Sequence, residues 1–178
     1  MCKKPILFLC IALIATSCTS NPGNSKSAEK PTYFNVKAYF DRESRTLNKR
    51  KVSVVKIVSV NGSTEKKEIV VQDWTKELSA FSNNDINKTA WQGEFSVTKT
   101  ESTILYRTKN IKIPVQELKV HTHNDTVDRV QLIIQNKNLL YTSTDTLTYL
   151  SGKFYKIKKE QKIWLLKPRE YIISGRIK

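Results

Sequence analysis

Two histidines and an aspartate alternate within five residues of the chain, as His121, His123 and Asp125. If this stretch is a strand, alternate side chains point the same way, so all three could face one metal ion. Zinc accepts such ligands, but it also needs a fourth ligand or a water molecule and supporting hydrogen bonds. The alternative is a hairpin turn at Asn124-Asp125 beside two exposed histidines. We favour the turn and predict no metal site.

Patterns typical of catalysis are not evident in the sequence. It contains no G-x-S-x-G or H-E-x-x-H motif and no glycine-rich phosphate loop, and only five glycines occur in all. Glu94 with Glu101, or Asp125 with Asp128, could supply paired carboxylates, but such pairs arise by chance in any soluble domain. We therefore predict a protein that is not an enzyme and that needs no cofactor.

The start of the chain carries a cysteine in a distinctive setting. Two lysines precede an apolar run over residues 6–15, and the small residues Ala15-Thr16-Ser17 lead directly into Cys18. This layout is typical of a secretory signal, and the run is too short for a transmembrane helix of roughly 20 residues. The small residues before Cys18 resemble the lipobox of bacterial lipoproteins. The resemblance implies cleavage before Cys18, a diacylglycerol on its thiol and a membrane anchor. An ordinary cleaved signal is the alternative.

Composition then divides the chain into three parts. We predict a lipoprotein signal peptide over residues 1–17, an acylated cysteine with a flexible Ser/Asn/Gly/Pro-rich tether over 18–32, and a single α+β domain over 33–178. About 146 residues suit one domain. All three cysteines lie in the first eighteen residues, so the processed chain can form no internal disulfide.

The formal net charge of +15 predicts attraction to polyanions. Export from the cytoplasm argues against nucleic acid as the partner. An envelope protein, anionic lipid or acidic glycan remains available. The alternative, which we favour, is that the lysines are solvated on exposed strand faces and protect sheet edges. The oligomeric state stays open.

Apolar spacing predicts helices over residues 33–47 and 74–86, the first capped by Thr32 and the second by Asp73. The first helix precedes every predicted strand. Trp74 opens the second helix and is followed by apolar residues at the fourth and seventh positions after it.

Asn61-Gly62 lies between two stretches rich in β-branched residues, 52–60 and 63–71, and predicts a hairpin. A strict two-residue turn would place Lys56 opposite Lys67, which is unfavourable. We therefore expect a longer loop and a different register.

Short strand-like stretches separated by turn residues fill the rest of the chain. They predict an α+β fold, with two N-terminal helices packed on a mostly antiparallel, meander-like curved sheet of about 7–9 strands. The further strands are expected at 91–98, 103–107, 111–122, 127–136, 139–149, 154–166 and 171–177.

Three tryptophans and two threonines are further candidates. Trp74, Trp91 and Trp164 could line an apolar pocket between sheet and helices, although we favour core packing. Thr126 and Thr146 each follow an aspartate and precede an aliphatic residue, which resembles the O-glycosylation sequon of Bacteroidota.

The C-terminal half resembles small, uncharacterised lipoproteins of Bacteroidota. This resemblance implies an envelope location and transfers no catalytic residue. In that phylum, an acidic run after the lipid-bearing cysteine resembles a signal for export to the cell surface. No such run follows Cys18, so we expect the protein on the periplasmic side of the outer membrane. The matching stretches are 138–143, 155–157 with 161–162, 171–175, and 85–88 with Trp91.

Together these features predict a membrane-anchored envelope lipoprotein that acts as a non-enzymatic binding or structural module. The alternative is a carrier or sensor of a lipid or other amphipathic ligand held between sheet and helices. A third hypothesis is an envelope hydrolase. A core filled by side chains would favour the first hypothesis, and an apolar cavity of several hundred cubic ångströms would favour the second.

Overall fold

The structure is a computed structural model that describes residues 32–178. The predicted signal peptide, the lipidation site Cys18 and the tether lie outside the described residues. Residues 32–178 belong to one compact unit. Within the described part of the chain, no helix has both the length and the apolar character needed to cross a membrane.

The first element is helix α1 (Val36–Arg50). It begins three residues later than predicted, because the side chain of Asn35, rather than that of Thr32, caps it by accepting a hydrogen bond from the Ala38 amide at 2.7 Å. Lys49 and Arg50 lie in its last turn, at the negative end of the helix dipole. The helix buries one face against the sheet.

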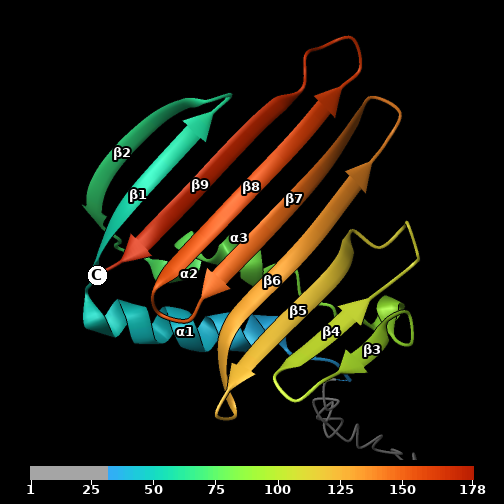
Figure 1. Cartoon of the computed structure of the whole chain (residues 1–178), viewed down its shortest axis with the longest axis horizontal. Coiled ribbons are helices and arrows are strands. Elements are labelled where there is room, and N and C mark those ends of the chain that lie inside the picture. Colours follow the sequence, from blue (N-terminus) through green and yellow to red (C-terminus); the bar gives the residue numbers. More distant parts are fainter. Residues whose placement is uncertain (1–31) are drawn as a thin grey trace, which may run out of the picture. The chain divides into compact units, whose positions relative to one another are not determined.

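Nine strands form one open, entirely antiparallel sheet, which confirms the predicted α+β class (Figure 1). The order is β2-β1-β9-β8-β7-β6-β5-β4-β3, so β3 to β9 form a meander and the β1–β2 hairpin joins it beside β9. The strands are β1 (Ser53–Val60), β2 (Ser63–Val70), β3 (Ser96–Lys99), β4 (Thr103–Arg107), β5 (Val115–His123), β6 (Thr126–Lys137), β7 (Tyr141–Leu150), β8 (Phe154–Ile163) and β9 (Arg169–Ile177).

The predicted helices were wrong in number and in place. Among residues 32–178, only α1 precedes the strands; α2 (Trp74–Glu77), α3 (Ser79–Ser82) and the 3-10 turn η1 (Thr89–Trp91) all follow the β1–β2 hairpin. The predicted second helix breaks at Leu78, whose backbone leaves the helical region. The Ser79 hydroxyl donates a hydrogen bond to the Lys76 carbonyl there, a local alternative to continuing the helix.

The β1–β2 hairpin corrects a second prediction. Lys56 does lie opposite Lys67, and the turn is the strict two-residue Asn61-Gly62, with φ angles of 50° and 90°. The repulsion is relieved because Glu77 of α2 forms a 2.7 Å ion pair with Lys56. A tertiary contact therefore permits a register that the hairpin alone disfavours.

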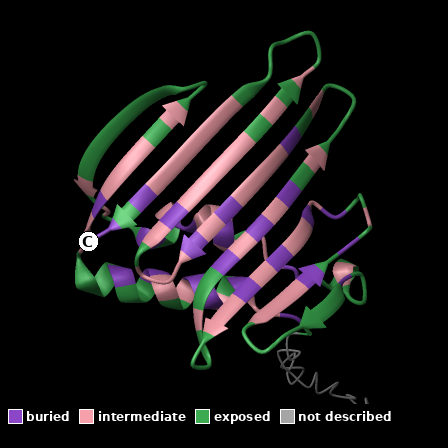
Figure 2. Ribbon diagram, viewed as in Figure 1, coloured by how far each residue is buried: buried purple, intermediate pink, exposed green. Residues whose placement is uncertain are grey.

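The space between helices and sheet is filled by aromatic side chains. Phe40 of α1 stacks on Phe81 of α3 at 4.9 Å between ring centroids, and Tyr149 of β7 meets Phe40 edge-on at 5.1 Å. Trp74 is fully buried beside them. Buried residues gather in the part of the strands near the helices (Figure 2). Beyond the helices, β7, β8 and β9 extend toward the loops at their far ends (Figure 1).

Candidate binding surface

Two tyrosine–glutamate contacts fix which face of the sheet the helices cover. The Tyr149 hydroxyl of β7 donates to Glu43 of α1 at 2.7 Å, and the Tyr155 hydroxyl of β8 donates to Glu77 of α2. Burial and the neighbouring carboxylates raise the pKa of both tyrosines above the ordinary value. The protonated, donating form of each hydroxyl is therefore the stable one.

Side chains alternate along a strand, so every second residue of β7 and β8, counted from the neighbours of these tyrosines, points to the opposite side of the sheet. We call that side the open face. On β7 it carries four threonines in a row, and the register places one charged side chain of β8 opposite each of them. The opposing pairs are Thr142 with Lys162, Thr144 with Glu160, Thr146 with Lys158, and Thr148 with Lys156.

Lys158 forms two ion pairs on the open face. Its ammonium group lies 2.9 Å from Glu160 and 3.0 Å from Glu170 of β9, and these two carboxylates raise the pKa of Lys158. The Glu170 amide donates to the Asn61 side chain at 2.9 Å, which ties the hairpin turn to β9. The result is a charged, hydrogen-bonding surface rather than an apolar one.

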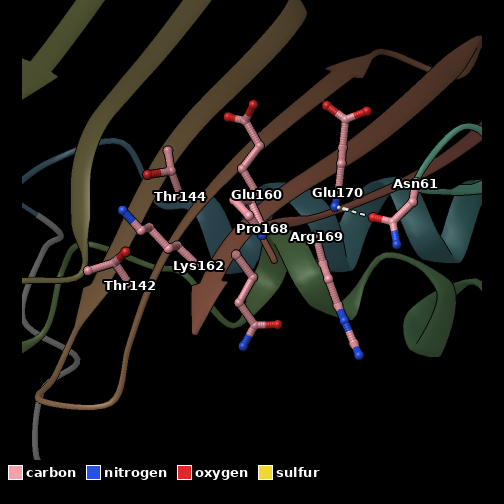
Figure 3. Close-up of a pocket in the computed structure, with 9 residues that line it drawn as sticks. Asn61, Thr142, Thr144, Glu160, Lys162, Pro168, Arg169 and Glu170 are labelled. Atoms are coloured by element: carbon pink, nitrogen blue, oxygen red, sulfur yellow. Dashed lines mark hydrogen bonds between the residues drawn. The ribbon is translucent and has the colours of Figure 1, made fainter. Parts of the chain in front are cut away.

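A hollow of about 360 Å³ lies at the far end of the strands. In Figure 3, Glu160 and Glu170 stand side by side and point to the same side of the strands, whereas Arg169 points to the other. The lining residues are Asn61, Thr142, Thr144, Glu160, Gln161, Lys162, Pro168, Arg169 and Glu170.

A second hollow of about 680 Å³ adjoins the first, and both are lined by Thr142 and Lys162. Its other walls are Asn138, Leu139, Leu140, Tyr141 and Trp164 from the ends of the β6–β7 and β8–β9 loops. The surface thus passes from hydrogen-bonding groups on the sheet to apolar groups at the loops.

A third groove, of about 670 Å³, lies on the helix side between the β1–β2 hairpin and α2; we call it the α2 groove. Ile157 and Ile173 form part of an apolar floor, and Lys56, Lys76 and Glu77 lie among the remaining walls. It is the observation that best fits an amphipathic ligand between sheet and helices.

The three metal-ligand candidates, His121, His123 and Asp125, are not brought together as a site. The Asn124-Asp125 turn is confirmed, with left-handed φ angles of 48° and 57°. The register shifts between His121 and Thr122, and the His121 ring forms a 3.0 Å hydrogen bond with the Thr103 hydroxyl. Residues 32–178 contain no group of three His, Cys, Asp or Glu side chains arranged to hold a metal ion.

The three tryptophans differ in how far they are buried. Trp74 lies fully inside the core, Trp91 is half-buried in η1 under the Lys88 ammonium at 4.1 Å, and Trp164 is exposed at a loop. They line no common pocket.

Sequence reasoning did not single out Glu43 and Glu77, although acidic residues on helix faces opposite strand tyrosines could have suggested them.

The candidate glycosylation residues occupy different settings. Thr126 is exposed at the start of β6, directly after the Asn124-Asp125 turn. Thr146 lies within β7 on the open face and is half-buried. Cys18 lies outside the described residues.

No protein-family model, curated protein or solved structure matches this chain.

Proposed function

We propose that this chain is a lipid-anchored envelope protein, held by Cys18 on the periplasmic side of the outer membrane, that binds an envelope protein or glycan through its open face. The observation that carries the proposal is the sheet itself, which buries one face under helices and leaves the other solvent-facing. The hydrogen-bonding rows of β7 and β8 and the adjoining hollows supply that face with recognition groups.

Binding through a sheet edge is less well supported than binding through the face. Edge strand β2 is exposed at nearly every residue and carries Glu65, Lys66, Lys67 and Glu68 in a row. Charged side chains of this kind discourage pairing with another strand. The opposite edge strand, β3, has only four residues.

The second candidate is a carrier or sensor of an amphipathic molecule, supported by the α2 groove. Its isoleucine floor suits an acyl chain and its lysines suit an anionic headgroup. The aromatic packing of Phe40, Phe81 and Tyr149 fills the space under the centre of the sheet, so the ligand would lie at this flank.

The anchor is tested by Cys18→Ala. In cells given labelled palmitate, the wild-type chain should take up label and the variant should not, because the thiol that accepts the lipid is gone. The variant should also accumulate as uncleaved precursor. Label retained by the variant would refute lipidation at Cys18.

The binding surface is tested by photo-cross-linking in intact cells. A photoreactive phenylalanine analogue is placed at Thr146 on the open face, at Val70 in the α2 groove, or at Arg45 on the exposed surface of α1 as the control. We expect a discrete product from position 146 and none from 45. A product from position 70 alone, resistant to protease, would favour the carrier. Equal products from 146 and 45 would refute the open face.

A further inference from the structure

Five large apolar side chains project into solvent at one end of the molecule. We call them the apolar tip: Leu139 is 97% exposed, Leu140 64%, Trp164 70%, Leu165 86% and Leu166 53%. A single exposed leucine is ordinary on a protein surface, but contiguous exposed apolar residues mark an interaction site. These five come from only two loops, β6–β7 and β8–β9.

The two loops form one structure. The Trp164 amide donates to the Leu140 carbonyl at 2.8 Å, which joins the loops side by side. Within the first loop, the Asn138 side chain accepts hydrogen bonds from the amides of Leu140 and Tyr141, each at 2.8 Å. Leu165 takes a left-handed backbone conformation with φ of 65°, unusual for a bulky residue. The apolar side chains are thus held outward by ordered turns.

The tip stands well away from the core. Trp164 lies nine residues beyond buried Tyr155 along extended chain, about 30 Å at the usual strand rise. The helices pack against the other end of β7 and β8 (Figure 1). The tip can therefore meet a flat surface without obstruction from the helices.

The charged residues in the two loops and the strand ends that adjoin them are all basic. Lys137, Lys162, Lys167 and Arg169 flank the five apolar residues and are exposed, and no acidic residue occurs within 136–144 or 161–169. In the described part of the chain, none of these four cations belongs to an ion pair. The nearest acidic groups along the chain, Glu160 and Glu170, are both bound to Lys158.

An apolar centre with tryptophan and a lysine-rich rim is the composition that favours the interface of an anionic bilayer. Leucine side chains gain by leaving water, tryptophan prefers the headgroup level, and lysines are attracted to lipid phosphates. We propose that the apolar tip inserts into the headgroup region of a membrane containing anionic phospholipid. This contact is separate from the acyl anchor expected at Cys18, because it is made by the folded domain.

The test uses residues 31–178, which lack the apolar signal segment and contain the compact unit with its hydrophobic core. Flotation is measured with vesicles of phosphatidylcholine alone and of equal parts phosphatidylcholine and phosphatidylglycerol. We expect binding to the anionic vesicles and quenching of Trp164 emission by brominated acyl chains. Trp164→Phe should remove most of the quenching, because Trp74 is buried and Trp91 half-buried.

Matched variants separate insertion from simple charge attraction. Leu139→Ser or Leu165→Ser should each weaken binding about tenfold, while Ile111→Ser, at a residue 90% exposed on another loop, should change nothing. Lys162→Gln and Lys167→Gln should each weaken it about fivefold, while Lys109→Gln and Lys153→Gln should have smaller effects.

Three results would overturn the proposal. The first is an absence of binding to anionic vesicles. The second is binding that depends equally on all lysines and on none of the tip leucines, which would be adsorption of a basic protein. The third is a tip that holds two copies of the chain together, seen as a dimer that Leu165→Ser dissociates without any effect on vesicles.

Discussion

Tyr39 and Tyr149 lie close together in the core, with ring centroids 6.3 Å apart, but their hydroxyl groups differ in their partners. The Tyr149 hydroxyl donates to Glu43 and accepts from the Gly152 amide at 3.1 Å. The Tyr39 hydroxyl is buried without a hydrogen-bond partner among the described residues. A polar group buried without a partner costs stability, whereas a paired one does not.

The same substitution at these two residues should therefore have different effects. Tyr149→Phe should lower the free energy of unfolding by about 1–3 kcal/mol, because Glu43 and Gly152 each lose a partner. Tyr39→Phe should leave it unchanged or raise it by up to about 1 kcal/mol, because only an unpaired hydroxyl is lost. Urea unfolding followed by circular dichroism measures both. Equal losses in the two variants would contradict this assignment.

At the scale of elements, the strands were the most predictable part of the fold. Alternating β-rich stretches and turn residues located all nine strands, and the Asn61-Gly62 and Asn124-Asp125 turns lie where expected. Local signals suffice there because each strand pairs with its neighbour along the chain from β3 to β9. The stretch beginning at Trp91 was the poorest, since Trp91 lies in η1 and β3 starts only at Ser96.

What depends on contacts between distant elements could not be predicted. Lys56 tolerates Lys67 across the hairpin only because Glu77 approaches from α2. Gly175 lies opposite Tyr155, and a Cβ at this position would overlap the tyrosine ring. Because glycine has no Cβ, the ring has room to reach Glu77. Neither constraint leaves a pattern in the local sequence.

The same limit applies to the candidate surface. Thr146 was singled out for its sequon, not for its place in a row of threonines, because the row becomes a surface only beside β8. Core packing was favoured for Trp164 over a pocket between sheet and helices, yet Trp164 lies exposed beside Leu140. Which aromatic residues face inward depends on where the helices end, and α1 to α3 cover only one end of the strands.

At the scale of the whole molecule, the two ends of the sheet differ in the residues that they carry. The helix-covered end holds the aromatic core and the paired tyrosines, and the far end carries the hollows and the apolar tip. Strand β1 pairs with β9, so Val54 lies opposite Ile177 and the first and last strands are joined. The buried core therefore lies at the opposite end of the sheet from the apolar tip.

The location of the tyrosines makes an alkaline pH test informative for the whole fold. Burial raises the pKa of Tyr39 to about 12, and burial together with the Glu43 and Glu77 carboxylates raises the pKa values of Tyr149 and Tyr155. In the unfolded chain these phenols ionise near pH 10. Above about pH 10 the unfolded chain therefore binds fewer protons than the folded one, so stability falls as pH rises.

We expect the free energy of unfolding to show no tyrosine contribution to its pH dependence below about pH 9. Above about pH 10 it should fall by about 1.4 kcal/mol per pH unit for each tyrosine still protonated in the folded state. Urea unfolding at a series of pH values measures the slope, and Tyr149→Phe should make it shallower by about one such step. A slope unchanged in that variant, or phenols that ionise together near pH 10 in the folded protein, would show that these tyrosines do not hold the helices to the sheet.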